Sequence, residues 1–510
     1  MVRREPALSV AHPSSLSPIV RRRLITTACL LAQFMAAVEA TIVGTAMPTI
    51  VGDLGGFHLF SWVFAAYLLA QAASTPIYGR LSDIYGRKRV FFVGATLFVV
   101  SSAVCGFAWG MVPLIVFRFV QGLGAGAIQP IAWTIIGDLY GPADRAKMQG
   151  WLSSVFGTSA IAGPALGALI VEHLHWSLVF WINLPIGIVV IVMLALLLDE
   201  KIALVRPRVD YPGAALLMIG VGALMIVLVQ RDGLGPATII ALTATGIIAL
   251  AALAWHETHV AEPIVPFKLW RQPMIAIGNF GAFVLGMMMM CNAGFMPAYV
   301  QGAMGRSPTV AGIVLGTSSV VWTLGTFIGG RLMISASYRV AGVVGSLIQL
   351  LGTGVLLGLE PERGPGFAAL GVGILSLGMG ICNTTFIVSV QTAVGWGDRG
   401  ATTGANLFMR TIGQALGAAL FGAVLSAGVS EQVPEAGDAV NLMLQPGMRG
   451  AIPAELVARL SAAFGSAMHS AYFIVGALGL MILAFTIRIP ARLSPTRPTG
   501  IAPLPAAADD

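Results

Sequence analysis

Long apolar runs, separated by short stretches of glycine, proline and charged residues, recur from residue 24 to residue 488. Each run is about 20 residues long, the length of an α-helix that crosses a bilayer, whereas membrane β-strands would alternate over about 10 residues. The pattern therefore predicts an all-α integral membrane protein. We count fourteen runs, at residues 24–47, 60–80, 90–109, 112–137, 148–171, 176–198, 212–230, 236–255, 274–299, 309–331, 340–358, 366–391, 403–427 and 467–488.

The composition agrees with this prediction. Of the 510 residues, 57% are hydrophobic and only 10% are charged, while a soluble protein carries about 25% charged residues. The net charge of +7 arises from basic residues in short loops between the runs, which favours membrane topology over nucleic-acid binding. The four cysteines stand singly inside apolar runs, so neither a disulfide framework nor a metal site is expected.

The 29 basic residues separate into two sets, as the positive-inside rule requires. With a cytoplasmic N-terminus, 22 of them fall in the termini and cytoplasmic loops, and five fall on the opposite side. Arg80, Arg331 and Arg488 end their runs on the cytoplasmic side and are counted there, so only Arg118 and Arg410 fall in the interior of runs. A missed or extra helix would mix the two sets. We therefore expect a multi-pass protein of the cytoplasmic (inner) membrane with both termini in the cytoplasm.

Two loops differ from the others. Residues 199–211 are polar and follow the sixth run, as expected of a hinge after a six-helix half. Residues 428–466 form the longest external loop. Within it, residues 453–464 are amphipathic and are expected to lie on the membrane surface, with a plain loop as the alternative.

The loop between the second and third runs carries a dense motif, GRLSDIYGRKR, at residues 79–89. Its glycines allow a tight turn, and Asp83 can meet a helix N-terminus or an arginine. Basic side chains such as Arg87 can pair with acids on neighbouring loops and so latch one conformation; the alternative is a solvated turn. The motif resembles the G-x-x-x-D-x-x-G-[RK]-[RK] signature of the major facilitator superfamily. The residues assigned to this conformational switch are Gly79, Asp83, Gly86, Arg87, Lys88 and Asp138.

An arginine stands inside the fourth run, in the sequence RFVQGLGAG at residues 118–126. A charged side chain within a membrane helix costs a few kcal/mol unless it is paired or hydrated. Arg118 is therefore a candidate functional residue, although snorkelling to the outer interface is an alternative. The run is similar to the R-x-x-Q-G-x-G-x-G element of the same superfamily, with Gln121 at the matching position.

The fifth run contains GPALGA at residues 163–168. It is similar to the G-P-x-x-G-G element that marks the exporter branch, with Ala168 in place of the last glycine. Pro164 bends the helix, while Gly163 and Gly167 allow a neighbouring helix to approach closely. A plain packing face is the alternative interpretation.

The first run contains EATIVGTAMP at residues 39–48, similar to the D-x-T-I-V-N-x-A-x-P of fourteen-span drug exporters. Here Glu39 keeps the carboxylate. A carboxyl group in a low-dielectric site is favoured in its neutral form and can exchange a proton. Glu39 lies about 22 Å along its run, at a depth similar to that of Arg118 entering from outside. A protonation-sensitive pair is therefore predicted for proton coupling, with a static pair as the alternative.

These motifs resemble the fourteen-span drug:proton antiporter branch of the major facilitator superfamily. The resemblance implies the major facilitator fold, in which two six-helix bundles surround a central cavity and two extra helices are inserted between them. The expected parts are a cytoplasmic tail (1–23), a first bundle (24–198), a linker region with two helices (199–272), a second bundle (273–489) and a cytoplasmic tail (490–510).

The resemblance also implies the function. We expect a proton-coupled exporter of hydrophobic, often cationic drugs that works by alternating access, as a monomer in the bilayer. Two alternatives stay open: a dedicated exporter of a metabolite, siderophore, lipid or antibiotic, and a non-transporting membrane receptor. The chain has no P-loop, H-E-x-x-H or G-x-S-x-G motif, so neither an enzyme nor a cofactor is expected.

Aromatic and polar residues within the runs are candidates for the substrate cavity. Aromatic rings can stack on a flat cation, although most aromatic residues in membrane helices serve packing. The candidates are Trp62, Tyr67, Gln121, Trp133, Trp322, Phe386 and Arg410.

Overall fold

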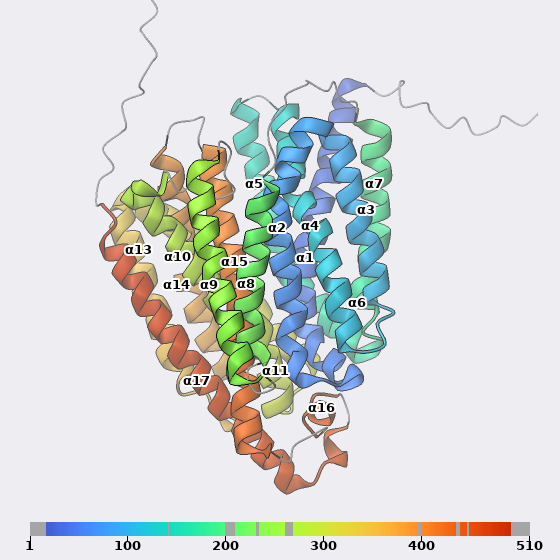
Figure 1. Cartoon of the computed structure of the whole chain (residues 1–510), viewed down its shortest axis with the longest axis vertical. Helices are drawn as coiled ribbons and strands as arrows, with labels where there is room; N and C mark the ends of the chain where they lie inside the picture. Colours follow the sequence, from blue (N-terminus) through green and yellow to red (C-terminus); the bar gives the residue numbers. More distant parts are fainter. Residues whose placement is uncertain are drawn as a thin grey trace, which may run out of the picture.

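The computed structural model describes residues 17–140, 142–198, 210–230, 234–260, 269–394, 399–434, 439–445 and 448–490. Within these ranges, every regular element is a helix (Figure 1). Thirteen helices of the described chain are long and apolar enough to cross a membrane. The predicted run at 148–171 is additional to these and falls within α5 (Pro142–His173), a helix of 32 residues. The predicted count of fourteen spans therefore agrees approximately with the structure.

The helices follow the predicted runs in order. The first half contains α1 (Pro18–Leu54), α2 (Phe60–Tyr85), α3 (Arg87–Cys105), α4 (Met111–Leu139), α5 (Pro142–His173), α6 (Leu178–Trp181) and α7 (Asn183–Leu197). The inserted pair is α8 (Tyr211–Gln230) and α9 (Pro236–His259). The second half contains α10 (Pro273–Met290), α11 (Met296–Ala298), α12 (Pro308–Ser335), α13 (Tyr338–Leu356), α14 (Gly364–Thr392), α15 (Arg399–Gln432), α16 (Ala439–Leu444) and α17 (Ala454–Ile487).

The two halves form two helix bundles that stand side by side (Figure 1). In the first, α4 packs on α2 and α3, and α1 packs on α5 and α7. In the second, α14 packs on α12 and α13, and α10 and α17 pack on α15. The bundles meet where α5 contacts α12 and where α2 contacts α15. The inserted α8 contacts α9, and also α2 and α15, so it touches both bundles.

Local sequence explains where several helices begin. Ser17, Ser307 and Ser337 each precede a helix, and each side chain accepts a hydrogen bond from a backbone amide of the first turn. Such caps satisfy amides that have no partner within the helix. Proline follows Ser17 and Ser307 directly, where its missing amide proton costs nothing.

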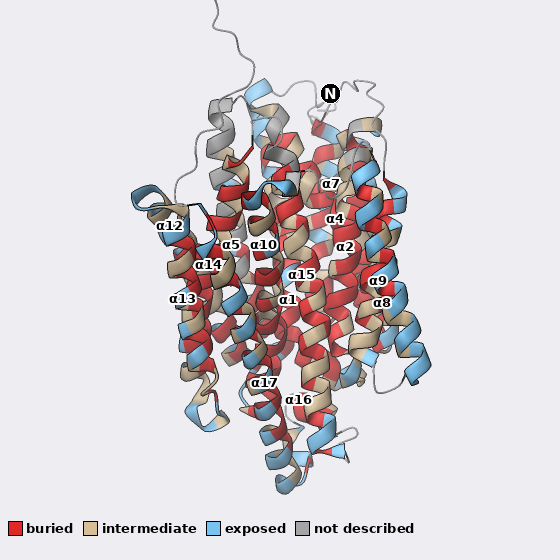
Figure 2. Cartoon of the chain, turned by 60° about the vertical axis from the view of Figure 1, so that its left-hand side comes forward, coloured by how far each residue is buried: buried red, intermediate tan, exposed pale blue. Residues whose placement is uncertain are grey.

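The outer surface of the bundles is apolar, as a lipid-facing surface must be. Figure 2 shows buried residues in the interior and exposed residues along the outer faces of helices such as α8 and α9. The exposed residues of α9 include Ile240, Ile247 and Trp255. In water these side chains would be unfavourable, whereas hydrocarbon is their natural solvent.

The start of α1 and the end of α17 both point toward the upper end of the molecule in Figure 1, and α16 lies at the lower end. At the lower end the two halves are joined by aromatic contacts. The ring of Phe57 lies 5.6 Å from that of Phe464, and the ring of Phe60 lies 5.4 Å from that of Phe295. The main-chain amide of Phe57 also donates to Asn441 Oδ1 at 3.3 Å. The lower end is therefore sealed in this conformation.

One expectation about the lower end is wrong. Residues 454–464 do not lie apart on a membrane surface, because they form the first turns of α17, which continues without a break to Ile487. Their apolar side chains, Leu460 and Phe464 among them, are buried against the protein. The amphipathic pattern reflects packing on the protein rather than on lipid.

Candidate functional site

The centre of the first bundle holds a buried ion pair. Arg118 of α4 donates from Nη1 to Glu39 Oε1 of α1, and the two side chains are 2% and 0% exposed. The alternating directions of α1 and α4 bring the two residues to the same depth, as the sequence predicted. Each charge compensates the other, which offsets the free-energy cost of burying both side chains.

Three further side chains close a ring of hydrogen bonds around this pair. Arg118 donates to Gln121 Oε1 at 2.8 Å, and Gln121 donates to Ser102 Oγ at 3.1 Å. Asn183 donates both to Ser102 Oγ, at 3.0 Å, and to Glu39 Oε2, at 2.6 Å. The ring thus joins α1, α3, α4 and α7, and both oxygens of Glu39 accept hydrogen bonds within it.

An aromatic face covers the guanidinium group. The Arg118 Cζ atom lies 4.1 Å from the centre of the Tyr67 ring and 5.8 Å from that of Phe180. Arg118 Nε donates to the carbonyl of Val63 at 3.3 Å. The phenol oxygen of Tyr67 is buried without a hydrogen-bond partner in the described part of the chain. The ring and its cover therefore exclude water from Glu39 in this conformation.

The GPALGA element packs directly beside Glu39. A Cβ atom on Gly163 would overlap Thr41 Oγ1, and one on Gly167 would lie 2.8 Å from the Ile42 carbonyl, so α5 needs glycine there to approach α1. On its other side, α5 meets the second bundle: a Cβ on Gly312 of α12 would lie 2.9 Å from the Pro164 carbonyl. The element therefore connects the helix of Glu39 to the interface between the bundles.

The second bundle repeats this packing. GQALGA at residues 413–418 matches GPALGA at 163–168 in all but one position. Gly413 and Gly417 of α15 lie against the backbone of α10 at Phe283 and Met287, as Gly163 and Gly167 lie against α1. This repeat was not predicted from the sequence, although the near identity of the two segments could have revealed it.

The predicted switch lies between α2 and α3. Gly86 has φ of 90°, a conformation that favours glycine, and it joins the end of α2 to the start of α3. Arg87 and Lys88 form the first turn of α3, and Gly79 stands near the end of α2. The side chains of Asp83 and Asp138 lie outside the described residues, so the latch stays a prediction.

The residues assigned to a substrate cavity fall into two groups. Tyr67 and Gln121 belong to the buried site around Arg118, and Phe386 is fully buried against Gly281 of α10, so it serves packing. Trp62, Trp133, Trp322 and Arg410 are partly exposed. The indole nitrogens of Trp62 and Trp133 are buried without a partner among the described residues.

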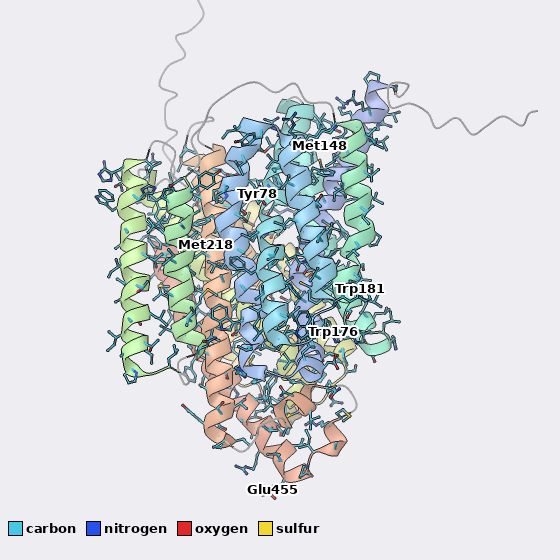
Figure 3. All side chains as sticks on the ribbon, turned by 45° about the vertical axis from the view of Figure 1, so that its right-hand side comes forward. Tyr78, Met148, Trp176, Trp181, Met218 and Glu455 are labelled. Atoms are coloured by element: carbon cyan, nitrogen blue, oxygen red, sulfur yellow. The ribbon has the colours of Figure 1, made fainter. Side chains whose placement is uncertain are left out.

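Ser102 and Asn183 were not predicted as site residues. Asn183 stands in the run FWINLPIG, whose single amide among apolar residues was the available signal. Elsewhere in the first bundle, Trp176 Nε1 donates to Asp53 Oδ2 at 2.6 Å in a partly buried hydrogen bond, with Trp176 near the lower end in Figure 3. Within the described ranges, no three His, Cys, Asp or Glu side chains are placed to hold a metal ion.

Comparison with protein families gives one clear match. The family model described as Major Facilitator Superfamily matches residues 29–418. The chain is 33% identical over 492 residues to "Multidrug resistance protein 3" of Bacillus subtilis (strain 168), which covers 91% of this chain and 94% of that protein. It is also 33% identical over 411 residues to "Multidrug transporter protein MdtP" of the same organism, covering 80% of this chain and 76% of that one.

Solved structures agree in fold. A bacterial homologue of the human lysosomal transporter Spinster, in an inward-facing and unoccupied conformation, superposes with a TM-score of 0.69 at 17% identity, covering 94% of this chain and all (100%) of that one. The D-xylose-proton symporter superposes with a TM-score of 0.62 at 14% identity, covering 93% and 99% of the two chains. At these identities the likeness concerns the fold alone.

Proposed function

This chain belongs to the Major Facilitator Superfamily, and we propose that it exports hydrophobic small molecules across the cytoplasmic membrane in exchange for protons. The family and fold are those of multi-pass membrane transporters. Relatives at 33% identity are named for multidrug resistance and multidrug transport. The export of hydrophobic compounds and the use of protons are the parts that we add.

The observation that carries the proposal is the closed ring around Glu39. Both oxygens of this carboxylate accept hydrogen bonds, one from a cation and one from an amide, so a proton that binds Glu39 weakens its contacts with Arg118 and Asn183. Conversely, a neutral Glu39 no longer compensates Arg118, whose buried charge then favours another arrangement. Proton binding at Glu39 and a change in helix packing are therefore thermodynamically coupled.

The packing offers a route from this ring to the interface between the bundles. Thr41 and Ile42 follow Glu39 on α1 and touch Gly163 and Gly167 of α5. The same stretch of α5 touches α12 at Gly312. A shift of α1 would therefore move α5 and change its contact with α12, which joins the two bundles.

The orientation in the membrane is inferred from the charge pattern. The upper end carries the basic loops, so the positive-inside rule favours a cytoplasmic position for it. The sealed lower end would then face outward, and we propose that this conformation accepts cargo from inside. We propose that the 79–89 motif, with Asp83, Arg87 and Asp138, stabilises the alternative conformation. Proton entry at Glu39 from outside would follow the release of cargo.

The test uses purified protein in liposomes with an imposed pH gradient. A panel of lipophilic fluorescent compounds, cationic, neutral and acidic, is followed for accumulation by wild type and by Glu39→Gln. Glu455→Gln is the matched control, because Glu455 is exposed at the lower end (Figure 3) and its substitution removes the same charge.

We expect gradient-driven accumulation that Glu39→Gln abolishes and Glu455→Gln preserves. Uptake that survives Glu39→Gln would place the proton site elsewhere. Uptake of a single member of the panel would favour a dedicated metabolite exporter built on the same machine. Binding without flux for every compound would contradict transport and favour a receptor.

A further inference from the structure

Arg410 is the second arginine inside a membrane span, and its surroundings differ from those of Arg118. It lies in α15, eight residues after Thr402 begins the span, so about 12 Å along it. Its Nη1 atom donates to Asn383 Oδ1 of α14 at 3.3 Å. Its Nε atom is buried and has no hydrogen-bond partner in the part of the chain that the structure describes.

No carboxylate among the described residues balances the charge of Arg410. Arg118 has Glu39 as its counterion, whereas none of the ion pairs between described residues includes Arg410. An unpaired guanidinium within a span is costly, and such groups are retained where they meet water, a partner or a ligand. A donor with unused hydrogens at this depth therefore points to a partner that is not part of the described chain.

The side chain lies on a polar seam between α14 and α15. Along the same seam, Gln391 donates to Thr403 Oγ1 at 3.1 Å. Gln414 follows Arg410 by one turn, and its amide donates to Met289 Sδ of α10 at 3.8 Å. Each of these side chains is partly exposed, although both helices are otherwise well buried.

This seam faces the inside of the protein. The back of α15 is pressed onto α10, because a Cβ on Gly413 would overlap the Phe283 carbonyl and one on Gly286 would overlap the carbonyl of Arg410 itself. A partly exposed guanidinium and the Gln414 amide within the span would be unfavourable against lipid, whereas Gln391 and Thr403 lie near the ends of their helices. The seam therefore borders the interior between the two bundles, where cargo must pass.

We propose that the cargo carries an acidic group, a carboxylate or a comparable oxyanion, and that Arg410 binds this group. The inference rests on the proposed export function and specifies its substrate class. A guanidinium presents a planar fork of donors that matches the two oxygens of a carboxylate. Asn383 holds the fork in place. Gln414, one turn further along α15, donates weakly to Met289 Sδ of α10 at 3.8 Å, a contact that an oxyanion of the cargo would replace.

The same geometry disfavours a cationic cargo. Glu39 is enclosed with Arg118 and Asn183, so it offers no free carboxylate to a cation in this conformation. A cation near Arg410 would meet a like charge, whereas an anion would neutralise the seam. The acidic group thus binds in the second bundle while proton exchange takes place in the first.

The test measures binding by purified protein in nanodiscs without a pH gradient. The probes are dansyl-undecanoic acid and its primary amide, which differ in charge but share the fluorophore and the chain. We expect wild type to bind the acid at least about tenfold more tightly than the amide. Arg410→Gln should remove this preference by weakening the acid alone, and Arg410→Lys should keep part of it. Arg363→Gln, which removes an exposed positive charge at a helix end of the same half, should leave the preference unchanged.

Two results would overturn the assignment: equal affinity of wild type for acid and amide, or an equal loss of both in Arg410→Gln. The comparison of the two probes on wild type needs no variant, so poor folding of Arg410→Gln would not leave the proposal untested. A clear preference for the acid, together with no gradient-driven flux in liposomes, would contradict the export proposal but support the binding of an acidic group at Arg410.

Discussion

Asn183 of α7 and Glu39 of α1 share a hydrogen bond of 2.6 Å, although they stand 144 positions apart in the chain. Asn183 also donates to Ser102 of α3, at 3.0 Å, so one amide group connects the carboxylate to two other helices. Since Arg118 donates to the other oxygen of Glu39, Asn183 is the second donor to this carboxylate, and its release leaves the ion pair intact. A substitution of Asn183 therefore tests the effect of its hydrogen bond on proton exchange without breaking the ion pair.

Removing this amide should impair coupling without destroying the fold. In Asn183→Ala, Glu39 keeps Arg118 but loses its second donor, and we expect gradient-driven transport to fall about tenfold. Asn183→Asp would replace the donor by a second carboxyl group beside Glu39, so we expect the pH profile of transport to change. A fall in rate with an unchanged pH profile in both variants would assign Asn183 a structural role only.

The ion pair predicts a characteristic double-mutant cycle. Arg118→Gln leaves Glu39 buried without its counterion, which costs about 3–5 kcal/mol when the carboxylate stays charged and less when it binds a proton. Glu39→Gln combined with Arg118→Gln removes both charges, and we expect it to recover most of the lost unfolding temperature in detergent. Neither variant should couple to protons. Additive losses of unfolding temperature would show that the two side chains do not interact.

The pairing of Glu39 with Arg118 was predictable because two opposite charges inside spans need partners and lie at one depth. Counting residues along two helices of opposite direction, at 1.5 Å a residue, places both groups at one level of the membrane. The glycine turn at Gly86 and the approach of α5 at Gly163 were predictable for a similar reason, since small residues at fixed spacings have few other uses.

The rest of the ring depends on how helices are rotated about their axes. Nothing in the apolar run around Asn183 says which way its amide points, and Ser102 is one of two adjacent serines. Phe386 was instead predicted to line the cavity and is fully buried. An aromatic side chain in a span can pack as readily as it can line a cavity, and the sequence does not distinguish the two. The start of α17 was mistaken for a surface helix because an amphipathic face does not reveal what covers it.

The packing of α5 on α1 can be tested at Gly163. Gly163→Val would press a side chain into Thr41, two residues from Glu39, and overpacking of this kind costs about 1–3 kcal/mol. We expect lower stability and a loss of transport greater than the loss of folded protein, because α1 is displaced at the ring. Gly316→Ala of α12 is the matched control, since a Cβ there has no neighbour within 4 Å. Equal activity of the two variants would contradict the role given to α5.

The sealed lower end gives the sharpest test of alternating access. A Cβ on Gly52, near the end of α1, would lie 2.8 Å from the Cβ of Gln445, just beyond α16, so the two halves touch there. Disulfides join Cβ atoms about 3.8 Å apart, which this pair reaches with a small shift. The four natural cysteines are all buried, so a double variant Gly52→Cys, Gln445→Cys should form one new cross-link on oxidation.

Oxidation should then stop transport, because a lower end held shut cannot release cargo. We expect the rate to fall below about a tenth and to return when a reductant opens the disulfide. Each single variant, oxidised in the same way, should keep its rate and so control for damage by the oxidant. Binding of cargo from the upper end should survive the cross-link, since the upper end need not move for it. A cross-linked protein that transports at full rate would mean that cargo leaves without separation of α1 from α16, and the rocking of two bundles would have to be replaced by a smaller local opening.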